Sequence, residues 1–153
     1  MNSLNGGMRV QDWVDFGLDD EMVKGAAMTP GEMKERTKAF ALRVIRAAKA
    51  LPNDVVSREL GRQLLRSGTS VGANYRAACR ARSRAEFLAK LGIVEEEADE
   101  SVYWMELLIE SGTVTNRRLG PLMREAQEIL AIVVSSINTA RSRQRTLGKK
   151  AGK

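Results

Sequence analysis

Histidine is absent from this chain of 153 residues, and its absence excludes several classes of enzyme. Histidine is the commonest general base and the commonest transition-metal ligand in proteins. Ser–His–Asp triads, Cys–His pairs and His-bearing zinc or di-iron sites are therefore excluded. An enzyme built on this sequence would have to use carboxylates, lysine or a single cysteine.

Cysteine and long apolar runs are scarce as well. Cys79 is the single cysteine, so no disulfide can form within the chain, as expected in a reducing cytoplasm. No apolar run approaches the roughly 18 residues that cross a bilayer, and the start of the chain lacks the basic-then-apolar order of a secretory signal. We therefore predict a cytoplasmic protein with no membrane segment.

Positive charge exceeds negative charge by six, and it is unevenly spread. Residues 28–83 and 113–153 carry net charges of +8 and +7, whereas residues 84–112 carry −6 and residues 1–27 carry −3. Basic segments of this kind are typical of nucleic-acid binding. Solvated helix faces have the same composition, and the charge pattern alone leaves both interpretations open.

The chain divides into an arm, a bundle and a tail. Residues 1–28 are rich in Gly and Asp without sustained periodicity, so we expect a poorly ordered N-terminal arm. The alternative is an extension from an upstream start codon, with Met28 as the true first residue. We expect a helical bundle over residues 29–145 and a frayed basic tail over residues 146–153.

The first helix has a clear start signal. Thr29 and Glu32 fit a capping box, and Pro30 stands at the first helical position. A helix over about residues 30–51 is predicted. Its apolar positions at helical spacing are Phe40, Leu42, Val44, Ile45 and Ala48.

The second helix follows a proline turn. Pro52 ends the first helix, and Asn53 or Asp54 caps the second, which is predicted over about residues 55–82. Its apolar stripe consists of Leu60, Leu64, Val71 and Tyr75. The small residues of the stretch 67–74 allow another helix to approach closely, so we interpret this stretch as a tight packing face rather than a ligand-binding notch.

Two more helices follow. Ser83 and Glu86 form a second capping pattern, and Gly112 ends the third helix as a C′ glycine. The buried seam predicted for this helix is Phe87, Leu91, Val94, Ala98, Val102, Met105 and Ile109. A fourth helix is expected over about residues 116–143. Four long helices with short links predict an all-α, antiparallel up-down four-helix bundle.

An acidic run on the third helix is a candidate metal site. It includes Glu96, Glu97, Asp99 and Glu100, and clustered carboxylates on a bundle helix can bind Mg²⁺ or Mn²⁺. All-α nucleotide pyrophosphohydrolases also need a second acidic pair, but here the stretch 125–128 ends in the wrong residue. We therefore favour a solvated acidic face, and we predict no metal, no cofactor and no catalytic residue.

Four arginines surround the turn between the second and third helices. Arg76 and Arg80 are one helical turn apart, and Arg82 and Arg84 flank the turn. Guanidinium groups bind phosphates through paired hydrogen bonds, so this cluster is our candidate nucleic-acid site, with Tyr75 and Trp104 as candidate stacking surfaces. The competing interpretation pairs Arg76 and Arg80 with glutamates of the third helix, within the chain or across a subunit interface.

Tyr103 and Trp104 are candidate interface residues. As neighbours on a helix they point about 100° apart, so one bundle core cannot take both comfortably. The other aromatic ring is then left for a subunit interface. We therefore expect an oligomer.

Residues 66–87 resemble the signature of a bacterial four-helix-bundle family named after intervening sequences in large-subunit ribosomal RNA. That signature reads approximately S-[IV]-x-x-N-[IV]-A-E-G, followed by a short basic stretch and S-x-x-E-F. The matching positions are Ser70, Val71, Asn74, Ser83, Glu86 and Phe87. Ala77 stands where the family has a glutamate and Tyr75 replaces an aliphatic residue, so no role of that glutamate carries over. The resemblance covers about residues 33–143.

The resemblance implies a ring-like homopentamer without catalytic residues. Related proteins include the accessory factor of diversity-generating retroelements, which binds nucleic acid and a reverse transcriptase. Our leading hypothesis is a non-enzymatic oligomeric scaffold that binds RNA or DNA through basic helix faces. The alternative is an interaction module for an acidic protein partner, and a divalent-metal nucleotide pyrophosphohydrolase ranks third.

Overall fold

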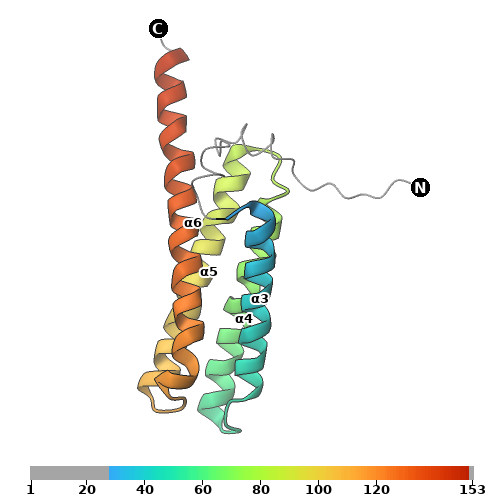
Figure 1. Ribbon diagram of the computed structural model, residues 1–153, viewed down its shortest axis with the longest axis vertical. Coiled ribbons are helices and arrows are strands. Elements are labelled where there is room, and N and C mark those ends of the chain that lie inside the picture. The colour runs from blue at the N-terminus through green and yellow to red at the C-terminus, as the bar shows by residue number, and fades with distance from the viewer. Residues whose placement is uncertain (1–27, 152–153) are drawn as a thin grey trace, which may run out of the picture.

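The computed structural model describes the backbone of residues 28–151 and the side chains of residues 28–142. The described chain forms four helices and no strand (Figure 1). They are α3 (Pro30–Lys49), α4 (Val55–Ala78), α5 (Arg84–Glu110) and α6 (Asn116–Ala151). The prediction of an all-α chain with four helices is confirmed. An N-terminal arm was predicted over residues 1–28, and residues 1–27 of it lie outside the described residues.

The predicted N-caps start three of the helices. The Glu32 amide donates to Oγ1 of Thr29 at 3.2 Å, and the Thr29 amide donates back to Oε2 of Glu32 at 2.6 Å, which completes a capping box. The Asp54 carboxylate caps α4, and the Glu86 amide donates to Oγ of Ser83 at 3.1 Å at the start of α5. Each cap satisfies an amide that has no partner within its helix.

Two helix ends differ from the prediction. Helix α4 ends at Ala78 rather than near Arg82, because the chain must turn before Ser83 can cap α5. Helix α6 continues to Ala151, past the predicted end near Arg143. Gly148 weakens a helix by about 1 kcal/mol but does not block it as proline would. The predicted end of α5 is confirmed by Gly112, whose φ of 75° suits glycine.

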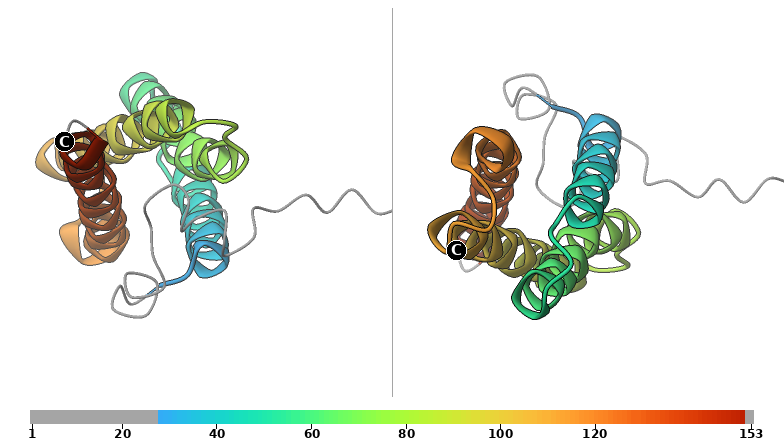
Figure 2. Two further views of the ribbon diagram at one scale, coloured as in Figure 1. Left: turned by 90° about the horizontal axis from the view of Figure 1, so that it is seen from above. Right: turned by 90° about the horizontal axis from the view of Figure 1, so that it is seen from below.

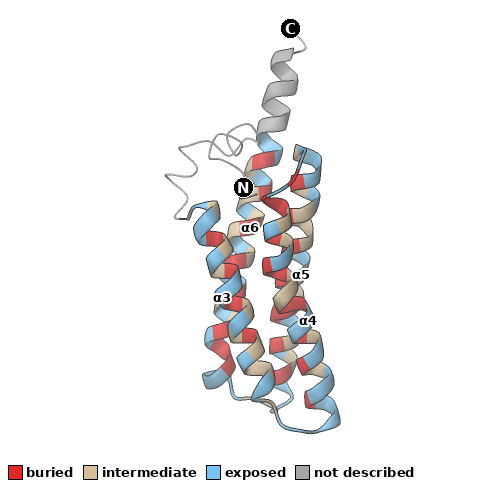
Figure 3. Ribbon diagram, turned by 90° about the vertical axis from the view of Figure 1, so that its right-hand side faces the viewer, coloured by how far each residue is buried: buried red, intermediate tan, exposed pale blue. Residues whose placement is uncertain are grey.

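Buried side chains lie on the inward faces of the helices (Figure 3). The seam predicted for α5 is buried from Phe87 to Met105, but it continues through Leu108, whereas Ile109 is only partly buried. On α3 the buried residues are Met33, Thr37, Phe40 and Val44. Leu42, one of the apolar positions of the predicted helix, is 48% exposed, because it lies about 200° around the helix from Phe40.

Glycines of α4 allow α3 to approach closely. A Cβ atom added to Gly68 would lie 2.7 Å from Cγ2 and 2.9 Å from Cγ1 of Val44. One added to Gly72 would lie 3.3 Å from the backbone oxygen of Thr37. A side chain at Gly68 would require the Val44 side chain to shift, and one at Gly72 would require the α3 backbone at Thr37 to shift. The prediction of a tight packing face in the stretch 67–74 is confirmed.

The helices pack as a chain of neighbours. Helix α4 packs against α3 and α5, and α5 packs against α6, while α3 and α6 contact each other much less than these pairs do. Seen along the helices, α4 and α5 form one side, and α3 and α6 are the two arms (Figure 2). The α3–α4 and α5–α6 loops lie at one end, and the α4–α5 connection lies at the other (Figure 1). None of the helices in the described part is long and apolar enough to cross a membrane.

Candidate nucleic-acid interface

Charge is segregated between the helices. The sequence of α5 contains eight acidic and two basic residues, whereas α3 contains six basic and two acidic residues and α6 contains eight basic and two acidic. The two arms of the bundle, α3 and α6, therefore each have a sequence with net positive charge. The outer face of α5 is acidic and exposed, with Glu96, Asp99, Glu106 and Glu110 around Tyr103. A polyanion is therefore attracted to α3 and α6 and repelled from α5.

The four predicted arginines lie at the α4–α5 end. Arg76 is on the last turn of α4, and Arg80 and Arg82 are in the connection, and all three are exposed. Arg84 begins α5 and is partly buried, with Nε and Nη2 shielded from solvent and without a hydrogen-bond partner. None of the four forms an ion pair within the part of the chain that the structure describes. The predicted pairing of Arg76 and Arg80 with α5 is therefore not formed within the chain.

A different arginine, Arg66, pairs α4 with the acidic helix. Its Nη1 lies 3.3 Å from Oε2 of Glu97, and its Nη2 donates to Glu100. The hydrogen bond from Arg66 lowers the pKa of Glu100, whereas burial raises the pKa of Glu97. Sequence reasoning missed Arg66, although the many acidic residues of α5 indicated that a basic side chain of α4 or α6 would pair with them.

The acidic run of α5 does not converge on one point. Glu97 and Glu100 face Arg66, whereas Glu96 and Asp99 are exposed. Residues 28–142 contain no group of three or more Cys, Asp or Glu side chains arranged to hold a metal ion. The pyrophosphohydrolase hypothesis gains no geometric support from this arrangement.

The single cysteine is part of the core. Cys79 is 2% exposed, and burial raises the pKa of its thiol to about 11. The thiolate, which is the nucleophilic form, is therefore scarce at neutral pH. Tyr75 is also buried, and the suggestion that it stacks on nucleic-acid bases was wrong because its ring does not reach the surface.

The two predicted interface aromatics differ in burial. Tyr103 is 50% exposed, while Trp104 packs partly against the core and its Nε1 donates to Oε1 of Glu100 at 3.2 Å. The two rings meet edge to face with their centroids 5.0 Å apart. Trp104 therefore supports Tyr103 from the core side, and Tyr103 is the ring left on the surface.

An ion pair joins α3 to α6. Nε of Arg36 lies 2.7 Å from Oε1 of Glu125, Nη2 of Arg36 lies 2.9 Å from Oε2, and Nη2 also contacts Glu128. Hydrogen bonding from Arg36 lowers the pKa of Glu125, and the charge of Arg43 lowers it further. This bidentate pair connects two helices that otherwise contact each other little.

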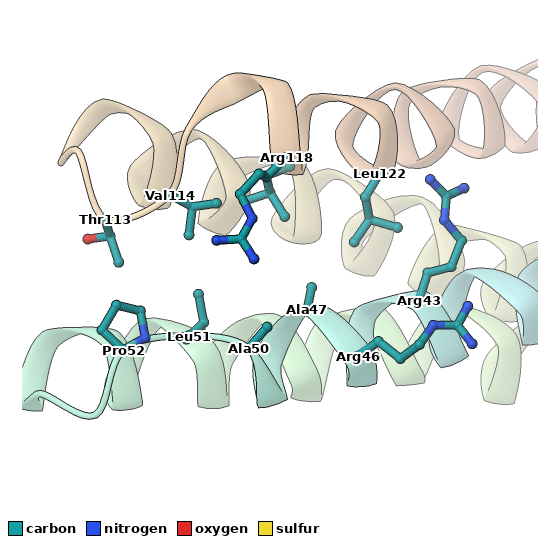
Figure 4. A pocket seen from close by; sticks show the side chains of 11 residues that line it. Arg43, Arg46, Ala47, Ala50, Leu51, Pro52, Thr113, Val114, Arg118 and Leu122 are labelled. Atoms are coloured by element: carbon teal, nitrogen blue, oxygen red, sulfur yellow. The ribbon is translucent and has the colours of Figure 1, made fainter.

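Beyond this ion pair, a cleft of about 450 Å³ opens between α3 and the start of α6 (Figure 4). Three arginines line it: Arg43 and Arg46 from α3 and Arg118 from α6. Sequence reasoning missed this site. The spacing of Arg36, Arg43 and Arg46 places them on one face of α3, but a solvated face has the same spacing.

Comparison with known proteins gives the family. Residues 31–135 match the family described as 23S rRNA-intervening sequence protein. The chain belongs to this family. No curated protein matches the chain significantly. The chain is also similar to a solved structure from Bacteroides thetaiotaomicron, described as a protein with unknown function from the S23 ribosomal protein family. The two are 39% identical with a TM-score of 0.65, and the match covers 69% of this chain and 97% of the other.

Proposed function

We propose that this chain is a non-enzymatic, oligomeric scaffold that binds RNA or DNA through basic helix faces. The observation that carries the proposal is the exposure of Arg76, Arg80 and Arg82 without ion-pair partners in the described residues, on a molecule whose acidic charge is gathered on α5. The family name, which refers to an intervening sequence of 23S rRNA, agrees with a polyanionic partner. A cytoplasmic location fits such a partner.

Contacts of this kind act on the backbone of the nucleic acid. Each guanidinium that meets a phosphate releases a condensed counterion, so affinity falls steeply as salt rises. Phosphate contacts position the polymer without reading its sequence. We therefore expect similar affinities for oligonucleotides of different sequence.

The proposed scaffold is an antiparallel up-down bundle that assembles into a ring-like homo-oligomer, with five subunits favoured by the family resemblance. The half-exposed Tyr103, seated on Trp104 and surrounded by acidic residues, supports α5 as a contact face. Light scattering should give a multiple of 16.9 kDa. Tyr103→Ala should shift the mass toward the monomer, and a wild-type monomer at micromolar concentration would contradict the proposal.

The binding test is an anisotropy titration with labelled single- and double-stranded RNA and DNA at 50 and 200 mM salt. Changing Arg76, Arg80 and Arg82 to Gln should weaken binding by roughly tenfold at the lower salt. The matched control changes Lys38, Arg58 and Arg62, which removes the same charge from side chains that already have partners. If the wild type binds no nucleic acid at low salt, the module for an acidic protein partner takes precedence.

A further inference from the structure

The α3–α6 cleft concentrates cationic groups that the chain itself does not neutralise. Its lining includes Arg43, Arg46 and Arg118 and no Asp or Glu. None of these three guanidinium groups forms an ion pair or hydrogen bond with another described residue. Arg118 extends from α6 toward α3, Arg43 extends from α3 toward α6, and Arg46 lies along the edge of α3 (Figure 4). Basic side chains from both α3 and α6 therefore line the same cleft.

Nearby carboxylates do not cancel this charge. The charge of Arg43 lowers the pKa of Glu125, but both oxygens of Glu125 already accept hydrogen bonds from Arg36. The dipole ends of α6 and α3 at the cleft have opposite signs, each equivalent to about half a charge, so they roughly offset each other. Three full positive charges remain in the cleft, and an anion is the ligand that they favour.

The remaining walls are apolar. Leu51, Pro52, Val114 and Leu122 line the cleft beside the arginines. Small-molecule sites of roughly 300–1,000 Å³ combine apolar walls with a few polar groups that fix orientation. At about 450 Å³ the cleft has room for about one nucleotide, with phosphate on the guanidinium groups and base or sugar against the apolar wall. It does not have room for a duplex.

We propose that the α3–α6 cleft binds the phosphate groups of a single nucleic-acid strand, with one nucleotide seated against its apolar wall. This inference rests on the proposed function, which supplies nucleic acid as the ligand, but it assigns a second binding site on the molecule. The α4–α5 arginines lie at one end of the molecule, and the cleft lies toward the end formed by the α3–α4 and α5–α6 loops. A strand that contacts both places would run along the length of the bundle.

The test compares two triple variants of the full chain. The cleft variant carries Arg43→Gln, Arg46→Gln and Arg118→Gln, which remove charge but keep most of each side-chain stem. The control variant carries Lys38→Gln, Arg58→Gln and Arg62→Gln and has the same net charge. Anisotropy is measured with a labelled single-stranded oligonucleotide at several salt concentrations. Melting temperature is measured with and without sodium tripolyphosphate, and mass is measured by light scattering.

The cleft variant should bind the oligonucleotide roughly tenfold more weakly than the control at 50 mM salt. The slope of log affinity against log salt should fall by about two, the value for three lost contacts to a single strand. Tripolyphosphate should raise the melting temperature of the wild type and the control but not of the cleft variant. These results together support the cleft as a phosphate site.

Three outcomes would overturn the inference, and they are distinguishable. If the wild type binds oligonucleotide and the cleft variant binds like the control, the cleft is not a binding site for the strand, and the proposed function stands. If the wild type responds to tripolyphosphate but binds no oligonucleotide, the proposed function fails and the cleft is a site for small polyphosphates instead of a strand. If the cleft variant alone changes in mass, the arginines belong to a subunit contact.

Discussion

Helix α3 meets its two neighbours in different ways. Toward α4 it packs so closely that Gly68 leaves no room for a Cβ beside Val44. Toward α6 it makes few contacts, and a bidentate ion pair from Arg36 to Glu125 stands beside a cleft lined by arginines. One helix therefore has a closed side and an open side.

The difference follows from side-chain size and charge. Glycine lets two backbones approach, and apolar burial then stabilises the contact by about 25 cal/mol per Å². Arginine has a long stem and a head that is always charged and costly to bury without a partner, so it keeps helices apart unless an anion lies between them. We infer that the closed side supplies stability, while the open side is free to bind.

The largest expected effect concerns the closed side. Gly68→Ala should destabilise the protein by up to about 2 kcal/mol, because overpacking costs about 1–3 kcal/mol and alanine regains about 1 kcal/mol of helix propensity. Val44 is β-branched and has little rotamer freedom with which to move away. Urea denaturation measures the change in the free energy of unfolding.

Gly92 on α5 provides the matched control. A Cβ added there meets nothing within 4 Å, so Gly92→Ala should stabilise the protein by up to about 1 kcal/mol. Opposite signs for the two substitutions would confirm that packing, rather than propensity, decides at Gly68. Equal stabilisation by both would show that α3 and α4 can separate at little cost.

Local chemistry made most of the fold predictable. Thr29, Asp54 and Ser83 start helices because their side chains bind nearby amides, and Gly112 ends one because it accepts a positive φ. These interactions involve residues a few positions apart. The seam of α5 was predictable for the same reason, since a 3.6-residue period fixes one inward face.

The cleft was not predictable, because it depends on how far α3 stands from α6. Arg43 and Arg118 are distant in sequence, and no local pattern says that they share a space. Leu42 shows the same limit on a smaller scale, since its apolar character suggested burial while the positions of Phe40 and Val44 turned it outward. Long-range spacing, rather than residue type, decides both cases.

An intermediate effect is expected at the ion pair of the open side. Arg36→Gln should cost about 1 kcal/mol at pH 7, because it leaves the partly buried Glu125 without its bidentate partner. Arg36 lowers the folded-state pKa of Glu125 from its usual 4.5, so the ion pair contributes its full stabilisation of the folded state at pH values above 4.5. The contribution is lost as the pH falls through the lowered pKa.

Urea denaturation of both proteins at pH 7 and near pH 3 measures this linkage. The difference in the free energy of unfolding between wild type and variant should shrink at the lower pH, since other carboxylates titrate alike in both proteins. Glu128→Gln is the control, and its side chain is 65% exposed, so its effect should be smaller. A difference that stays constant with pH would mean that Glu125 keeps its charge for another reason.

The smallest effect on stability is expected in the cleft, where the comparison is sharpest. Arg46→Gln and Arg118→Gln should each change the free energy of unfolding by less than about 0.5 kcal/mol, as is usual for exposed side chains without partners. The summed effect of the two substitutions on the free energy of unfolding should be zero or slightly stabilising. Neighbouring like charges repel each other at low salt, and removing the two arginines removes this repulsion. Urea denaturation at 20 and 200 mM salt tests this, and any gain should be largest at the lower concentration. A loss above about 1 kcal/mol would show that these arginines hold α3 against α6, and the open side would then be structural like the closed one.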